Sequence, residues 1–153
     1  HLTSGYQFLD AKDKAVLSAL REGTLFRRDP ETLTTSRVRP SEYGGLLGRS
    51  VHSANVRIFC EFKSGWGFTI RGIYRGRFGI ADLNGNAILD TPEEYASGYW
   101  LWNTSLSKTI HALTVQVGTD NLLGYTDPIN VPNLAGRLLW VRMSTSLGRT
   151  KHQ

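Results

Sequence analysis

Hydrophobic and polar residues alternate with a period of two over much of the chain from residue 51 onward. Successive side chains of a β-strand point to opposite faces, so this alternation predicts strands. The predicted strands are residues 56–62, 67–74, 77–82, 98–103, 108–117 and 137–145. Glycine-containing turns separate the first three, which predicts a meander of neighbouring strands.

The alternation also predicts which side chains share a face. Val56, Ile58 and Cys60 lie on one side of their strand, and Cys60 is expected to be a buried, unreactive thiol because it belongs to this apolar side. Within 108–117, His111 falls in register with apolar residues and is expected to be a core residue. In the last strand, the residues expected to point inward are Leu139, Val141 and Met143, with Trp140 and Arg142 outward.

The first fifty residues have a different pattern. Apolar residues at helical spacing between Leu9 and Leu20 predict a helix that begins at the cap Asp10 and ends at Gly23. Residues 1–8 are expected to be an irregular lead, 24–28 a short strand, and 29–50 a long loop rich in Pro, Thr, Ser and Gly, which we expect to contact partners. The predicted fold is α+β and mainly antiparallel β, a sandwich or a single sheet of about six or seven strands with one N-terminal helix. Residues 1–153 are expected to form a single domain.

Oxygen-bearing side chains recur at fixed spacing in the segment 82–94, DLNGNAILDTPEE. Calcium takes six to eight oxygen ligands, and a loop supplies them when alternate residues point inward and a carboxylate closes the sphere. The predicted ligands are Asp82, Asn84, Asn86, the backbone carbonyl of Ile88, Asp90 and Glu93. The alternative is an acidic turn between two strands, because Asn-Gly is also a hairpin signal.

This segment resembles the calcium loop of EF-hand and dockerin proteins over residues 82–93. The resemblance implies that a Ca²⁺ ion holds the loop together. One position differs, because Ala87 stands where such loops have a glycine with positive φ. We expect the neighbouring Gly85, Asn84 or Asn86 to adopt the left-handed conformation instead.

Charge points to a second class of function. The net charge is +5, and the bases are mostly arginine, whose planar guanidinium suits anion recognition. Arg71, Tyr74, Arg75 and Arg77 are the candidate polyanion-binding residues, because Tyr74 offers a stacking ring among positive charges. Nucleic acid and acidic polysaccharide are the corresponding partners. The alternative is a solvated strand edge protected by charge.

No nucleophile, phosphate-loop or paired-cysteine motif is present, so the sequence favours a non-enzymatic protein. One enzymatic alternative remains, a copper brace in which the amino group and ring of His1 act with His52, His111 or His152. A first-residue histidine also arises from processing or tagging. The sequence has no apolar run of about 20 residues, the length that a membrane-spanning helix needs, which predicts a soluble domain.

The order of an N-terminal helix, a sheet and an acidic loop between strands is similar to the globular heads of minor pilins and pseudopilins. This resemblance implies a subunit that assembles with itself or with other subunits. The calcium loop favours an extracellular or cell-surface location, because such loops are occupied continuously where calcium is plentiful. The sequence therefore supports three hypotheses. They are a calcium-stapled assembly or binding domain, a basic polyanion-binding module, and a copper enzyme.

Overall fold

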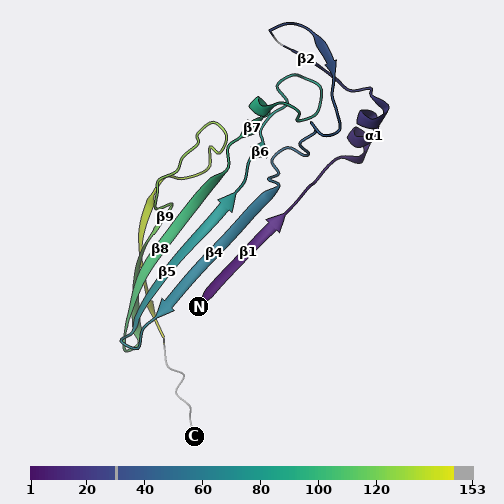
Figure 1. The fold of residues 1–153 in the computed structure, drawn as a ribbon. Helices are drawn as coiled ribbons and strands as arrows, with labels where there is room; N and C mark the ends of the chain where they lie inside the picture. The colour runs from purple at the N-terminus through teal and green to yellow at the C-terminus, as the bar shows by residue number, and fades with distance from the viewer. Residues whose placement is uncertain (30, 147–153) are drawn as a thin grey trace. The chain divides into compact units, whose positions relative to one another are not determined.

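A computed structural model describes residues 1–29 and 31–146. Its main feature is an antiparallel sheet of six strands in the order β1-β4-β5-β8-β9-β10 (Figure 1). The strands of this sheet are β1 Leu2–Phe8, β4 His52–Glu61, β5 Trp66–Arg75, β8 Tyr99–Ile110, β9 Leu113–Asp120 and β10 Leu138–Thr145. The remaining elements are α1 Lys14–Glu22, β2 Phe26–Arg28, β3 Thr35–Arg37, β6 Phe78–Gly79, the 3₁₀ turn η1 Pro92–Glu94 and β7 Tyr95–Ala96. The predicted α+β class, mainly antiparallel with one helix near the N-terminus, is confirmed, and the main sheet is single rather than a sandwich.

The chain divides into two compact units. We call the first the sheet unit; it comprises His1–Gly5, Ala54–Tyr74 and the chain from Trp100 onward. We call the second the helical unit; it comprises Tyr6–Ser53 and Arg75–Tyr99. Nearly all of the six-stranded sheet belongs to the sheet unit, and the helical unit holds α1 and the small ladders β2-β3 and β6-β7.

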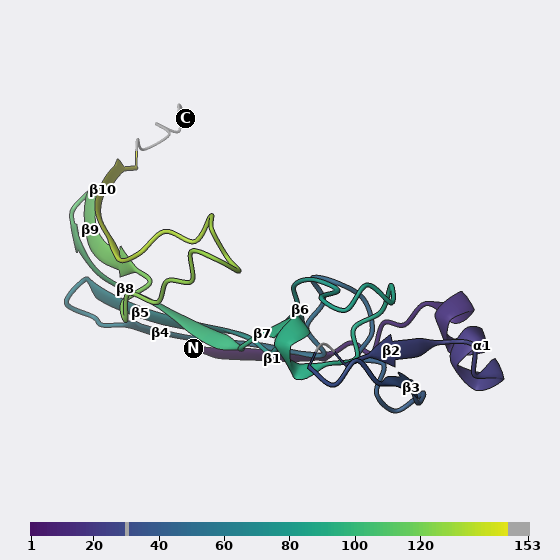
Figure 2. The same ribbon diagram turned by 90° about the horizontal axis from the view of Figure 1, so that it is seen from above.

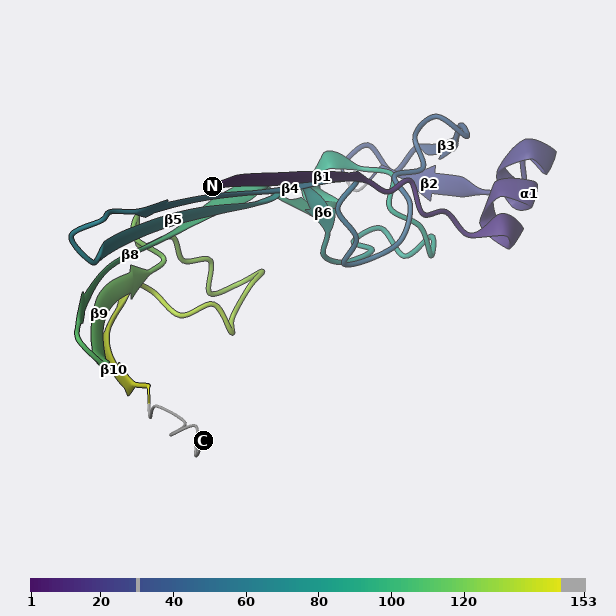
Figure 3. The same cartoon turned by 90° about the horizontal axis from the view of Figure 1, so that it is seen from below.

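The register of the sheet unit fixes which side chains share a face. Leu106 of β8 lies opposite Val117 of β9, which lies opposite Val141 of β10. Directly opposed residues project to the same side, so these three form a row across the sheet. In β8–β10 the sheet curves, and the connection 121–137 lies on its concave side (Figures 2 and 3).

One face of the sheet unit is apolar and uncovered; we call it the apolar face. It carries the large hydrophobic side chains of Leu2, Ile58, Trp66, Phe68, Trp100, Leu106, Ile110, Leu113, Val117, Leu139, Val141 and Met143, each more than a third exposed. Among the exposed large hydrophobic side chains on the described strands of this unit, Leu138 alone points to the other face. Leu139, Val141 and Met143 share a face as predicted, but they are 81%, 65% and 72% exposed instead of buried. The prediction of an inward orientation is therefore wrong, because in the described residues no second layer covers this side.

The hydrophobic core lies in the helical unit. Leu20 of α1 packs with Val38, Tyr43 and Ile88, all at most 4% exposed. The segment 29–50, expected to be a long loop, supplies Val38 and Tyr43 to this core and contains β3. Every buried hydrophobic side chain among the described residues belongs to this unit.

The helix starts three residues later than predicted. Asp13, rather than Asp10, is the N-cap, and its carboxylate accepts the backbone N–H groups of Ala15 and Val16. The predicted stop is confirmed, since Gly23 closes the helix with a φ of 75°. Glycine adopts this left-handed conformation without the steric cost that a Cβ brings. No helix in the described part of the chain is both long and apolar enough to cross a membrane.

Three strand predictions need correction. Residues 2–8 form β1 instead of an irregular lead. The predicted strand 77–82 is reduced to β6, which pairs with β7 and does not continue the meander. The predicted strand 108–117 is a hairpin, because the chain turns at His111, where φ is 54°. His111 is thus an exposed turn residue and not the core residue that we expected.

Candidate functional site

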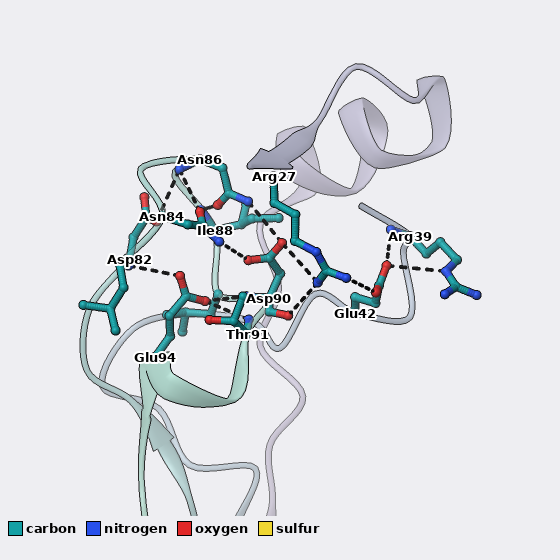
Figure 4. Close-up of polar contacts among 12 residues, drawn as sticks. Arg27, Arg39, Glu42, Asp82, Asn84, Asn86, Ile88, Asp90, Thr91 and Glu94 are labelled. Atoms are coloured by element: carbon teal, nitrogen blue, oxygen red, sulfur yellow. Dashed lines mark hydrogen bonds and ion pairs between the residues drawn. The ribbon is translucent and has the colours of Figure 1, made fainter. Parts of the chain in front are cut away.

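A polar site in the helical unit is built around Glu94, the last residue of η1 (Figure 4). Its side chain is completely buried. One carboxylate oxygen accepts the backbone N–H of Leu83 at 3.0 Å, and the other accepts those of Asp90 and Thr91 at 2.7 and 2.9 Å. Glu94 therefore joins the start and the end of the loop 82–94 through three charge-assisted hydrogen bonds.

Side-chain oxygens also hold the middle of the loop. The Asp82 carboxylate accepts backbone N–H groups from Gly85, Asn86 and Ala87, the last at 2.6 Å. The Asn84 and Asn86 carbonyl oxygens each accept the N–H two residues further on, at 3.2 and 3.1 Å. The two asparagine bonds are Asx turns, and together with the bonds to Asp82 they wind the backbone around its own polar side chains.

Asp90 is the acceptor at the centre of this loop. The amide nitrogens of Asn84 and Asn86 donate to its two carboxylate oxygens at 2.8 and 3.1 Å. The Arg27 guanidinium approaches the same carboxylate at 3.8 Å and donates to the Asp90 backbone carbonyl at 3.3 Å. Arg27 also donates to Glu42 at 2.9 Å (Figure 4). An arginine thus supplies positive charge beside the Asp90 carboxylate, one of the predicted calcium ligands.

The predicted calcium ligands are brought together except at the closing position. Asp82, Asn84, Asn86, Ile88 and Asp90 belong to the network described above, whereas Glu93 is exposed and its neighbour Glu94 is the buried carboxylate. No group of three or more His, Cys, Asp or Glu side chains in residues 1–29 and 31–146 is arranged to hold a metal ion.

The backbone of the loop is strained at the position where calcium loops have glycine. Ala87 itself has a φ of 66°, in addition to Gly85 at 72°. Gly85 thus adopts the left-handed conformation as expected, but Ala87 adopts it as well, so the expectation that Gly85 would do so instead of Ala87 is wrong. A non-glycine residue in this conformation costs roughly 1–2 kcal/mol, which the hydrogen bond from Ala87 to Asp82 helps to offset.

The four candidate polyanion-binding residues do not form one surface. Arg71 and Tyr74 are an odd and an even position of β5 in the sheet unit, so they project to opposite faces. Tyr74 packs on Trp100, with 5.0 Å between ring centroids. In the helical unit, Arg75 donates to the Gly48 carbonyl at 2.8 Å and lies over the Phe78 ring, and Arg77 lies over the Tyr95 ring at 4.2 Å. Arg75 and Arg77 therefore have internal partners.

The histidines of the copper hypothesis lie in different parts of the chain. The amino group of His1 donates to the Phe59 carbonyl at 2.7 Å, and its ring stacks on Phe59 in the sheet unit. His52, in the helical unit, shares a 2.6 Å hydrogen bond with the Tyr6 hydroxyl. His111 lies at the turn between β8 and β9, and His152 lies outside the described residues.

Sequence reasoning missed Glu94, Arg27 and Glu42 as members of this site. A local signal for Glu94 exists, because Thr91 and Glu94 have the spacing of a capping box, and the structure has that box. For Arg27 and Glu42 no local signal exists, since they come from segments far from residues 82–94 along the chain.

Comparisons with protein-family models, with curated proteins and with solved structures find no match to this chain.

The difference between Glu93 and Glu94 leads to a first prediction. Glu94→Gln replaces an acceptor oxygen by an NH₂ group that faces backbone N–H donors, so it should lower the free energy of unfolding by about 1.5–3 kcal/mol. The exposed matched variant Glu93→Gln should change it by less than about 0.5 kcal/mol. Urea titrations in the presence of a chelator measure both. A larger loss for Glu93→Gln would contradict this assignment.

A second prediction concerns Glu42. Its pKa lies below the ordinary 4.5, chiefly because the Arg39 backbone N–H donates to the carboxylate; partial burial opposes this shift and the Arg27 guanidinium adds to it. A lowered folded-state pKa means that Glu42 stabilises the fold above pH 4.5 and that this contribution is lost as the pH falls through the lowered value.

The stability difference between the parent protein and Glu42→Gln should therefore be constant near neutral pH and shrink below pH 4.5. Urea titrations of both proteins from about pH 3 to 7 measure the difference, in which the other titrating groups cancel. A difference that does not change with pH would show that Glu42 does not act through its charge.

Proposed function

We propose that this chain is a non-enzymatic, membrane-associated protein whose sheet unit is embedded with its apolar face against lipid hydrocarbon. One observation carries the proposal. The strands of the sheet unit place their large apolar side chains on one face, and the described chain buries none of those side chains in a core. Fully burying one Leu, Val or Met side chain is worth about 1.5–3 kcal/mol. A face with this many exposed side chains therefore requires a covering partner.

Strand length and aromatic placement favour lipid as that partner. Strands β4, β5 and β8 have 10, 10 and 12 residues and reach the roughly 9–11 residues that a tilted strand needs to match a bilayer, whereas β1, β9 and β10 are shorter, with 7, 8 and 8. Trp66 begins β5, and Tyr74 lies near its other end. Eight residues at about 3.3 Å each separate them by about 26 Å along the strand. At a strand tilt of about 35–45° this corresponds to about 19–22 Å along the membrane normal, somewhat less than the apolar band of about 25 Å in membrane sheets.

Residues that are typical of the membrane–water interface lie at both ends of the apolar face. Trp and Tyr concentrate at the level of lipid headgroups because their rings are apolar and their N–H and O–H groups are polar. At one end Tyr74, Trp100 and Trp102 stack in sequence, with centroid distances of 5.0 and 5.3 Å. At the other end the Lys108 amine lies 4.9 Å from the Trp66 ring and donates to the Ser64 carbonyl at 2.6 Å, so a positive charge accompanies the aromatic ring there.

The edges of the sheet add a further requirement. β1 and β10 end the strand order, so each presents one row of backbone groups without a strand partner among the described residues. Unpaired backbone groups cost several kcal/mol each in hydrocarbon. In the proposed arrangement, further strands of the same or another polypeptide pair with both edges. The assembly that we expected from the sequence would then occur by pairing of strands at the edges of the sheet.

A charge placed on each face tests the proposal. Val117→Arg puts a guanidinium in the middle of the apolar face and should reduce the stability of the vesicle-bound protein by about 2–4 kcal/mol. Its neighbour Gln116, on the other face, provides the matched control, and Gln116→Arg should leave binding nearly unchanged. The measurements are co-flotation with phosphatidylcholine vesicles and the blue shift of tryptophan fluorescence.

Two outcomes would contradict a lipid partner. The first is a parent protein that stays unbound to vesicles and remains a monomer in water. The second is a stable dimer in water that Val117→Arg dissociates, which would make a second copy of this chain the partner of the apolar face.

Calcium binding at residues 82–93 remains part of the proposed function, with a surface location where calcium is abundant. The support is the wound loop, in which Asn84 and Asn86 hold their side-chain oxygens by Asx turns and the Asp82 carboxylate accepts backbone N–H groups of the same loop. Calcium at about 100 times its dissociation constant should raise the free energy of unfolding of the helical unit by about 2.7 kcal/mol. Asp82→Ala should abolish that gain. Thermal unfolding in calcium, magnesium or chelator measures this gain in stability. Equal melting temperatures in calcium and in chelator would show that the segment is an acidic turn that binds no calcium.

A further inference from the structure

The second face of the sheet unit, which we call the polar face, forms a basic groove. This groove crosses the strands from β1 to β10 and encloses about 1050 Å³. Arg57, Arg71 and Arg142 line it, together with the amides of Asn55, Asn103 and Gln116. Asp120 is its one carboxylate. Because alternate residues of each strand face opposite sides, most of the lining belongs to the polar face, although Thr104 and Leu139, which project to the apolar face, also contribute to it.

The three arginines of this groove have no acidic partner in the described structure. The ion pairs among residues 1–29 and 31–146 involve other side chains. Arg57 and Arg71 are exposed, and Arg142 contacts the Trp140 ring at 5.9 Å. A guanidinium presents donors in a planar fork that fits a carboxylate or phosphate, so an anionic ligand would complete the groove.

We propose that this groove binds an acidic polypeptide segment. Arg57 and Arg71 lie on neighbouring strands, whereas Arg142 lies three strands beyond Arg71 in the order β5-β8-β9-β10. At about 4.8 Å between strands this separation is about 14 Å, too far for one small anion to contact all three. The volume of the groove also lies at the upper end of the range for ordinary small-molecule sites, which is about 300–1000 Å³.

The lining favours a polypeptide over a nucleic acid. Asn55, Asn103 and Gln116 carry amide donors and acceptors. The Asn103 Oδ1 already accepts the Asn121 N–H and the Gln116 Nε2 already donates to the Ser105 hydroxyl, and the remaining donor and acceptor positions suit the N–H and C=O groups of a peptide backbone. Asp120 adds a negative charge, which would repel the continuous row of phosphates of a nucleic acid. A peptide avoids this repulsion by placing an uncharged or basic residue beside Asp120. Carboxylates of the segment pair with Arg57, Arg71 and Arg142.

The test measures the affinity of the folded protein for a fluorescein-labelled peptide of alternating Ser and Glu. The double variant Arg57→Gln/Arg71→Gln should bind this peptide about a hundredfold more weakly, because each lost arginine–carboxylate pair costs about tenfold. Arg49→Gln removes the same charge from an exposed arginine of the helical unit and should leave the affinity unchanged. Circular dichroism confirms that the variants fold.

A charge reversal gives a gain-of-function measurement. Arg57→Glu/Arg71→Glu should lose the Ser-Glu peptide and gain the matching Ser-Lys peptide, a result that misfolding cannot produce. Two results would overturn the proposal. They are no binding of the Ser-Glu peptide by the parent chain, and tighter binding of an oligo-dT strand with a steep dependence on salt, which would make the groove a nucleic-acid site.

Discussion

The two-residue period of the strands is the constraint on which the sheet unit depends. A shift of one residue in the pairing of β9 would move Val117 and its row to the other face. The hairpin at His111 and Ala112 fixes that pairing, since Thr109 and Thr114 lie opposite each other and share a 3.0 Å hydrogen bond between their hydroxyls. A tight turn with left-handed backbone at His111 therefore determines which side chains the apolar face displays.

Sequence alternation predicted the faces of the strands better than their burial. Leu139, Val141 and Met143 share a side because the period is local, and the sequence carries that period in full. Burial depends on a second layer, and nothing in a strand's own pattern specifies whether protein, lipid or water covers it. The hairpin at His111 was missed for a local reason. Its turn lacks the Asn-Gly or Gly residues that mark such turns, and alternation continues straight through it.

In the loop 82–94, two local patterns overlap and differ by one residue at their end. Calcium-loop spacing selects Glu93, whereas capping-box spacing from Thr91 selects Glu94. The structure buries Glu94 because its carboxylate accepts three backbone N–H groups, which would otherwise remain without partners in the interior. Arg27 and Glu42 were beyond sequence reasoning, since a tertiary ion pair has no periodic signature.

The two units are stabilised by different interactions, and this difference bears on the solvent that each one needs. The helical unit has a small apolar core around Leu20 and a satisfied polar network around Glu94, an arrangement suited to water. The sheet unit relies on backbone ladders, whose hydrogen bonds are stronger where the dielectric constant is low. Its apolar face lowers the free energy only when removed from water, and the stacked rings of Tyr74, Trp100 and Trp102 keep polar N–H and O–H groups near one end of that face.

Gly72 makes room for this stack, because a Cβ there would lie 2.7 Å from the Trp102 ring. A glycine inside a strand weakens the strand in isolation, so its presence here is explained by the aromatic boundary that it permits.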